Sequence, residues 1–267
     1  KSGRCSENCK FCAQSAHYDT GCAEVYDLLP TEDILKEAKY NDDQGVLRYS
    51  IVTSGKRLTD EEVDQVCESI RKIKEETNIE VCFSFGLLKE EQLRKVREAG
   101  ATRAHCNLET SRRYFPEICT THTYDQKIET LKAAVAAGLS ICSGGIMGLG
   151  ETLEDRVDMV LTAKELGVKS VPVNFLNPIP GTPYEDNKPL TDEEARQCVA
   201  VFRFIIPDAS IRLAGGRGLL DDKGKECFQS GANAAISGDM LTTAGITVQK
   251  DMEMLKDLGY KPQLWED

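Results

Sequence analysis

Three of the eleven cysteines stand close together near the start of the chain, as Cys5-x3-Cys9-x2-Cys12 in the stretch CSENCKFC. Thiols at such short spacing can form disulfides, bind zinc or hold an iron–sulfur cluster. Structural zinc sites usually take four ligands from paired C-x2-C units, and the sequence has no second pair. Three thiolates instead favour a [4Fe–4S] cluster whose fourth iron is left open for a substrate or cofactor.

The overall composition favours a reducing compartment and a soluble protein. The chain has 267 residues, an odd number of cysteines and a net charge of −11. An odd count argues against a complete disulfide framework, and clustered thiols in a reducing cytosol are usually metal ligands or catalytic groups. No leader pattern and no apolar run of about 18 residues is visible. We therefore expect a cytoplasmic protein that binds neither nucleic acid nor a membrane.

Strand and helix signals alternate along the chain, which is typical of a parallel α/β sheet. Capping boxes at Thr59–Glu62 and Thr191–Glu194 predict two helix starts, and glycines such as Gly100 predict helix ends. We predict one domain, 1–267, folded as a TIM-type (βα)8 barrel or an incomplete one, with its first strand truncated at residues 1–4. The expected strands are 47–54, 80–86, 102–109, 139–148, 170–178, 209–215 and 234–238.

The cysteine loop resembles the cluster loop of the radical S-adenosylmethionine (SAM) superfamily, C-x3-C-x-aromatic-C, with Phe11 as the aromatic residue. Within that superfamily the chain is similar to the biotin synthase family. Five motifs in order carry this resemblance: CSENCKFCAQSAHYDTG (5–21), CSGGIMGLGET (142–152), VNFLNPIPGTP (173–183), IRLAGGR (211–217) and GANAAISGDMLTTAG (231–245). They span nearly the whole chain, so the resemblance is more specific than the cysteine spacing.

The resemblance implies which residues hold the cofactors and the substrate. Cys5, Cys9 and Cys12 would bind the [4Fe–4S] cluster, and SAM would chelate its open iron. The residues expected to contact the cluster loop or SAM are Phe11, Asn107, Glu109, Lys127, Gly144, Ile146 and Gly148. Glycine at 144 and 148 would let the backbone approach a flat ring closely. The residues expected to bind the substrate, dethiobiotin, are Asn107, Asn174, Thr242 and Thr243.

The family also carries an auxiliary iron–sulfur cluster that supplies sulfur, held by three cysteines and an arginine. Cys82, Cys142 and Arg212 match that set, but Ser50 stands where the third cysteine is usual. Alkoxide is a poor substitute for thiolate on iron. We expect Cys22 to replace it, ahead of Cys106 and Cys119, in a cluster of the two-iron or a variant four-iron type. Cysteines in helical stretches, Cys67, Cys198 and Cys227, are expected to fill the core.

The resemblance implies radical sulfur insertion that converts dethiobiotin to biotin, with a flavodoxin- or ferredoxin-type electron donor and a homodimeric enzyme. Two alternatives stay open from the sequence. One is a sister radical SAM enzyme of the hydrogenase-maturation or methylornithine-forming type, which need not keep Cys142, Arg212, Thr242 and Thr243 together. The other is a cluster- or zinc-binding protein without catalysis.

Overall fold

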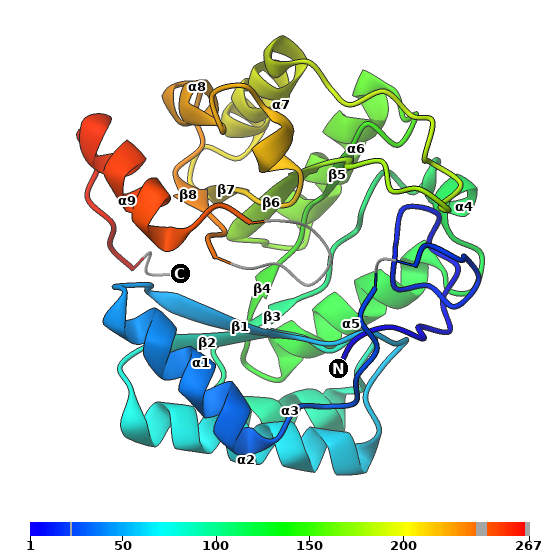
Figure 1. Cartoon of the computed structure of the whole chain (residues 1–267). Coiled ribbons are helices and arrows are strands. Elements are labelled where there is room, and N and C mark those ends of the chain that lie inside the picture. Colours follow the sequence, from blue (N-terminus) through cyan, green and yellow to red (C-terminus); the bar gives the residue numbers. More distant parts are fainter. Residues whose placement is uncertain (22, 239–244, 265–267) are drawn as a thin grey trace.

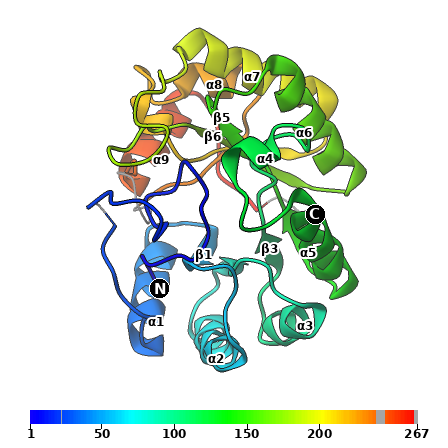
Figure 2. The same cartoon turned by 90° about the vertical axis from the view of Figure 1, so that its right-hand side faces the viewer.

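The computed structural model describes residues 1–21, 23–238 and 245–264. Their strands form a single parallel sheet in the order β1-β2-β3-β4-β6-β7-β8, with β5 also paired to β6. The sheet is curved, and the helices lie on its outer side (Figures 1 and 2). The strands are β1 (Arg48–Val52), β2 (Glu80–Ser84), β3 (Arg103–His105), β4 (Ser140–Cys142), β5 (Gly145–Met147), β6 (Ser170–Phe175), β7 (Ser210–Leu213) and β8 (Ala234–Ala235).

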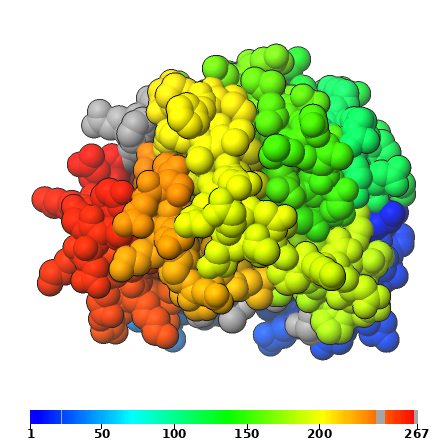
Figure 3. Space-filling model, turned by 90° about the horizontal axis from the view of Figure 1, so that it is seen from above, coloured from blue at the N-terminus to red at the C-terminus, as the bar shows by residue number. Residues whose placement is uncertain are grey.

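The helices connect successive strands, as parallel pairing requires. They are α1 (Thr31–Asp43), α2 (Asp60–Glu76), α3 (Glu90–Glu98), α4 (Phe115–Ile118), α5 (Tyr124–Ala136), α6 (Leu153–Glu165), α7 (Asp192–Ile205), the 3-10 turn η1 (Arg217–Leu219), α8 (Lys225–Gln229) and α9 (Val248–Asp257). Neighbours along the chain pack against each other, α1 with α2 and α6 with α7 among them. From above, the outer layer runs from the green α6 through the yellow α7 to the red α9 (Figure 3).

Local sequence signals explain where several helices start. Thr59 and Thr191 form the predicted capping boxes, and Thr152 forms another with Asp155. α1 has no side-chain cap: Thr31 is its first residue, Pro30 precedes it, and the hydroxyl of Thr31 bonds to Ser69. The chain therefore starts α1 with proline geometry rather than with a side-chain cap.

The predicted α/β barrel is confirmed in an incomplete form. In the part of the chain that the structure describes, β1 and β8 each pair with one neighbour, so the sheet stays open between them. Residues 1–4 do not form the expected first strand. Ser2 instead makes one antiparallel bridge with Tyr26, and the carbonyl of Lys1 accepts from the N–H of Ser54, 3.1 Å away. The N-terminal loop thus lies at the carboxyl end of β1.

The predicted strand 139–148 is divided into β4 and β5, and the segment after β3 continues to pair with it through a single parallel bridge, Glu109–Gly145. The N–H of Glu109 donates to the carbonyl of Gly144 at 3.0 Å, and the N–H of Ile146 donates to the carbonyl of Glu109 at 2.9 Å. Together β4 and β5 fill one position of the sheet, between β3 and β6. No helix of the described residues is long and apolar enough to cross a membrane.

Candidate functional site

A cavity of about 1540 Å³ lies inside the curve of the sheet. Pockets for a single small ligand usually measure roughly 300–1,000 Å³, so this one has room for more than one group. Its wall joins the N-terminal loop to strands from both halves of the chain. The predicted site residues among those that line it are Phe11, Cys12, Ser50, Cys82, Asn107, Glu109, Ile146, Asn174 and Arg212.

The cysteine loop is folded by its own backbone hydrogen bonds. The N–H of Cys12 donates to the carbonyl of Cys9 at 3.0 Å, and Cys5 pairs with the segment 14–16 through two bonds of 2.8 Å. The side chains of Cys5, Cys9 and Cys12 are all partly exposed and none is in a disulfide. Burial raises the pKa of the Cys12 thiol to about 11. The loop lies beside α4, with the N–H of Lys10 donating to the carbonyl of Ile118 (Figures 1 and 2).

These residues fit the groups that the loop is predicted to hold. Three free thiols on one short loop form the donor set of a [4Fe–4S] cluster with an open iron. Two polar atoms of residues that line the same cavity, Glu109 Oε2 and Arg212 Nε, are buried and lack a hydrogen-bond partner among the described residues. Buried polar atoms are normally paired, so both are suited to a bound group.

The segment after β3 brings Asn107 and Glu109 to the same side, as strand alternation predicts. Glu109 has φ of +72°, which is uncommon for a residue with a side chain and is often found at functional sites. A Cβ on Gly144 would lie 2.0 Å from the carbonyl oxygen of Pro172. Glycine at 144 is thus required by neighbouring protein backbone, whereas the sequence suggested that a cofactor ring required it.

Glu151 belongs to the motif CSGGIMGLGET (142–152) and stabilises the backbone of that motif. Its Oε1 accepts from the N–H of Gly148 at 2.9 Å and from Nε of Arg156 at 2.6 Å. Gly148 has φ of +102°, which favours glycine. Ile146 lines the cavity, whereas Gly144 and Gly148 do not. The motif therefore fixes the shape of the wall and presents Ile146 as its apolar surface.

Three titratable groups in or near the cavity have shifted pKa values. Burial, together with the charge of Arg212, lowers the pKa of His105 to about 4, so this imidazole is neutral at physiological pH. Burial raises the pKa of Glu109. Burial alone would lower the pKa of Lys127, but the neighbouring Cys106 and Glu109 raise the pKa overall. Lys127 does not line the cavity, but it remains a cation close to Cys106 and Glu109.

Two of the predicted auxiliary-cluster residues are in contact. Arg212 Nη2 lies 2.5 Å from Cys142 Sγ. Cys82 is buried and pairs in register with the exposed Ser50 on the neighbouring strand. Cys22 lies outside the described residues, as do Thr242 and Thr243. Cys106 is buried in the core rather than on the cavity wall, which agrees with strand alternation.

The two predicted substrate asparagines are already engaged through their amide oxygens. Asn107 Oδ1 accepts from the N–H of Gly144 at 3.1 Å and lies 2.8 Å from His105 Nε2. Asn174 Oδ1 accepts from the N–H of Gly215 at 2.9 Å, and its Nδ2 donates to the carbonyl of Gly145. Toward a ligand these side chains are therefore mainly donors, suited to a carbonyl oxygen.

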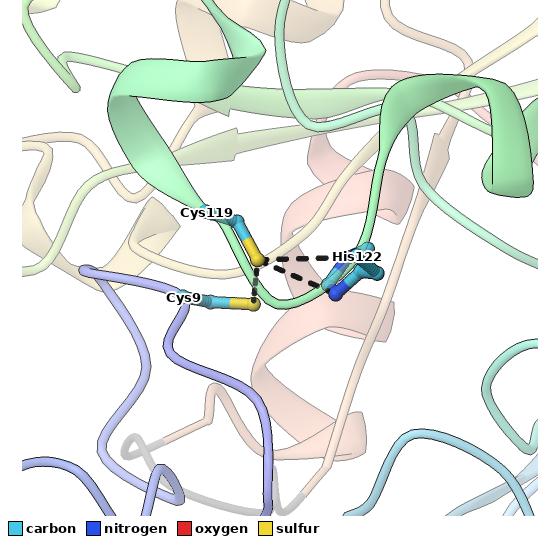
Figure 4. A group of neighbouring side chains, drawn as sticks. All are labelled: Cys9, Cys119 and His122. Atoms are coloured by element: carbon cyan, nitrogen blue, oxygen red, sulfur yellow. Dashed lines mark hydrogen bonds between the residues drawn. The ribbon is translucent and has the colours of Figure 1, made fainter.

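The sequence offered Cys119 only as a lesser candidate for the auxiliary cluster and gave no role to Glu7 or His122, yet the three lie together at the cysteine loop. Cys119 Sγ is 3.7 Å from Cys9 Sγ, and His122 Nδ1 is 2.6 Å from Glu7 Oε2 (Figure 4 shows the two cysteines and His122). The hydrogen bond from Cys9 lowers the pKa of the Cys119 thiol. The only signal in the sequence was the pair C-x2-H at 119–122, which has no fixed distance from the loop.

Comparison with known proteins agrees with this arrangement. Residues 1–163 match the Radical SAM superfamily, and residues 172–261 match the Biotin and Thiamin Synthesis associated domain. A biotin synthase of Brachyspira hyodysenteriae is 59% identical over 267 residues, which cover 100% of this chain and 80% of that protein. A biotin synthase of Akkermansia muciniphila is 59% identical over 264 residues, 99% of this chain and 82% of that protein.

Solved structures of lower identity share the fold. A crystal structure of methylornithine synthase superposes with a TM-score of 0.82 at 20% identity, over 97% of this chain and 80% of that one. An FeFe-hydrogenase maturase from Carboxydothermus hydrogenoformans superposes with a TM-score of 0.79 at 18% identity, and the match covers 96% of this chain and 64% of that one. By the match to its first 163 residues and by its full-length identity to these relatives, the chain belongs to the biotin synthase family of the radical SAM superfamily.

Proposed function

We propose that this protein converts dethiobiotin to biotin by radical sulfur insertion at the cavity inside the sheet. One observation carries the proposal. The same cavity is lined by Cys12 of the cysteine loop, by Cys82 of β2 and by Arg212 of β7. A site of this kind can hold a radical-generating group and a sulfur source around one substrate.

Each part of the site has a task in this proposal. Cys5, Cys9 and Cys12 would hold a [4Fe–4S] cluster, with Phe11 on the same loop. Glu109, whose Oε2 has no hydrogen-bond partner among the described residues, would accept a hydrogen bond from SAM, and Lys127 would pair with the carboxylate of SAM. When bound, the cluster and SAM supply a carbon radical that can remove hydrogen from an unactivated carbon. The protein positions the substrate and keeps water out.

Substrate binding follows from the engaged asparagines. Asn107 and Asn174 offer N–H donors to the ureido carbonyl of dethiobiotin, because their oxygens already accept from Gly144 and Gly215. Thr242 and Thr243 bind its carboxylate. Ile146 supplies an apolar surface beside them. These contacts hold the substrate in one orientation, which a regioselective hydrogen abstraction needs.

The auxiliary cluster in this proposal is a variant. Cys82, Cys142 and Cys22 would hold it through thiolates, with Arg212, whose Nη2 contacts Cys142 Sγ, beside them. Ser50 is left out, since oxygen is a weak ligand for this type of iron site. Measuring iron and sulfide per chain distinguishes a two-iron from a four-iron cluster.

Anaerobic turnover tests the function directly. The reconstituted protein is incubated with SAM, dethiobiotin and a reductant, and 5′-deoxyadenosine and biotin are measured by mass spectrometry. We expect both products. 5′-Deoxyadenosine without biotin would instead favour a sister radical SAM enzyme, and neither product would favour a non-catalytic cluster protein.

Replacing Cys142 with alanine should separate the two half-reactions. Cys142 is fully buried against Arg212, away from the cysteine loop, so Cys142→Ala removes an auxiliary ligand and leaves Cys5, Cys9 and Cys12 in place. We expect 5′-deoxyadenosine to form and biotin to fall below detection, with a lower iron content. Biotin formation at the wild-type level would remove Cys142 from the auxiliary site.

Cys22→Ala tests the replacement ligand. Iron and sulfide are counted on anaerobically purified protein beside wild type and beside Cys67→Ala, which alters a buried cysteine of α2. We expect lower iron only in Cys22→Ala. Equal iron content in all three proteins would exclude Cys22 and leave the third thiolate to another residue.

The remaining expectations concern organisation and partners. The chain is proposed to be one domain, which is supported by the single sheet that continues across the boundary between the two family matches. A flavodoxin- or ferredoxin-type electron donor, a homodimer and a cytoplasmic location stay predictions from the family resemblance. Size-exclusion chromatography with light scattering tests the dimer.

A further inference from the structure

Three side chains that the proposed reaction does not use together form a compact donor set beside the cysteine loop. Cys119 Sγ lies 3.7 Å from Cys9 Sγ, and 3.3 and 3.9 Å from the two ring nitrogens of His122 (Figure 4). One ligand atom from each residue lies within 4.8 Å of the others. We call Cys9, Cys119 and His122 the thiol–imidazole triad.

The spacing of the triad is that of a tetrahedral metal site. With Zn–S of about 2.3 Å and Zn–N of about 2.0–2.1 Å, tetrahedral angles place two sulfurs about 3.8 Å apart and sulfur and nitrogen about 3.5 Å apart. The observed Sγ–Sγ distance of 3.7 Å matches the first value, and Cys119 Sγ lies 3.3 Å from Nδ1 and 3.9 Å from Nε2 of His122. All three donors lie within 4.8 Å of one another, so side-chain rotation is needed to bring them onto one ion.

A second layer of contacts orients the imidazole. Glu7 Oε2 lies 2.6 Å from His122 Nδ1, and both side chains are buried. With the proton on Nδ1 and shared with the carboxylate, Nε2 keeps its lone pair free for a metal. A carboxylate that holds the far nitrogen of a metal-binding histidine is the usual arrangement around zinc, and it makes the imidazole a better ligand.

The loop that carries Cys119 and His122 is fixed to the cysteine loop. Asn8 Oδ1 accepts from the N–H groups of Thr120 at 2.9 Å and Thr121 at 3.2 Å, and the N–H of Asn8 donates to Thr121 Oγ1 at 3.0 Å. Cys119 is 3% exposed and His122 8%. The triad is therefore positioned by contacts that do not depend on any bound ion.

We propose that the cluster-free chain binds one divalent zinc-type ion at Cys9, Cys119 and His122, with a fourth position for water. Binding forms two metal–sulfur bonds and one metal–nitrogen bond, and the thiol protons are released to solvent. This ion and the [4Fe–4S] cluster exclude each other, because both need the thiolate of Cys9. Only this exclusion rests on the proposed function, since it takes Cys9 as a cluster ligand.

Cobalt serves as the probe, because Co²⁺ takes zinc-type sites and reports tetrahedral thiolate coordination by its absorption. The full-length chain without cluster, reduced and anaerobic, is titrated with Co²⁺ and then with Zn²⁺. We expect one Co²⁺ per chain, tetrahedral bands, a thiolate-to-cobalt charge-transfer band, and displacement by Zn²⁺. The absence of a tetrahedral spectrum in protein whose thiols are shown to be free would overturn the site.

Variants distinguish the triad from metal binding by the cysteine loop alone. Glu7→Gln should weaken Co²⁺ binding about 10–100-fold, and Cys119→Ala should weaken it further because a ligand is lost. Cys5→Ala and Cys12→Ala should bind as wild type does, and Cys67→Ala controls for the loss of a buried thiol. Loss of binding in Cys5→Ala with none in Cys119→Ala would assign the ion to the loop.

The exclusion has its own readout. Cluster-loaded protein should take up no Co²⁺ at this site, and protein preloaded with Zn²⁺ should incorporate less iron during reconstitution than Cys119→Ala treated in the same way. Tetrahedral Co²⁺ bound to protein that keeps its full cluster absorption would contradict the exclusion. Co²⁺ binding without any biotin formation would leave the site standing and remove the proposed function instead.

Discussion

Cys12→Ala should abolish SAM cleavage. Cys12 is the cysteine of the loop that faces the cavity, and its removal leaves two thiolates, too few to hold a cluster with one open iron. We expect 5′-deoxyadenosine to fall below detection and the absorption of the reconstituted cluster to be lost, with biotin absent as a consequence. The measurement is single-turnover product analysis beside iron counting.

The matched control changes a cysteine that only packs. Cys67 lies in α2, is 2% exposed and belongs to the core. Cys67→Ala should keep its cluster and its SAM cleavage, with a small loss of stability from the removed sulfur. If Cys12→Ala retained both the cluster absorption and 5′-deoxyadenosine formation, the assignment of the loop would be wrong.

Asp251→Ala should strongly destabilise the fold. Asp251 of α9 accepts two hydrogen bonds from Arg217, at 2.8 and 2.6 Å, and the side chains of both residues are almost fully buried. Removing one partner of a buried pair leaves an uncompensated charge and costs about 3–5 kcal/mol. We expect the thermal midpoint to fall by about 10 °C.

Controls separate the buried charge from other effects. Asp257→Ala changes an exposed aspartate of the same helix and should alter the free energy of unfolding by no more than about 0.5 kcal/mol. The double variant Arg217→Met with Asp251→Leu replaces the pair by apolar side chains and should recover most of the loss. A midpoint for Asp251→Ala equal to that of wild type would show that Arg217 finds another partner or reaches water.

The sequence was sufficient for features that depend on a few neighbouring residues. The capping boxes at Thr59, Thr152 and Thr191 form as local patterns predict, because each joins groups three residues apart. Strand and helix alternation predicted the parallel sheet, and period-two alternation placed Asn107 and Glu109 on the same side. The three cysteines were found because their spacing fits within one short loop.

Only the tertiary structure decided the features that join distant segments. It divided the predicted strand 139–148 into β4 and β5, and it engaged the amide oxygens of Asn107 and Asn174. It also brought Cys119 to Cys9 across 110 positions of sequence. Contacts at such separation depend on how strands stack in the sheet and how their loops close, and no local pattern of residues encodes those distances.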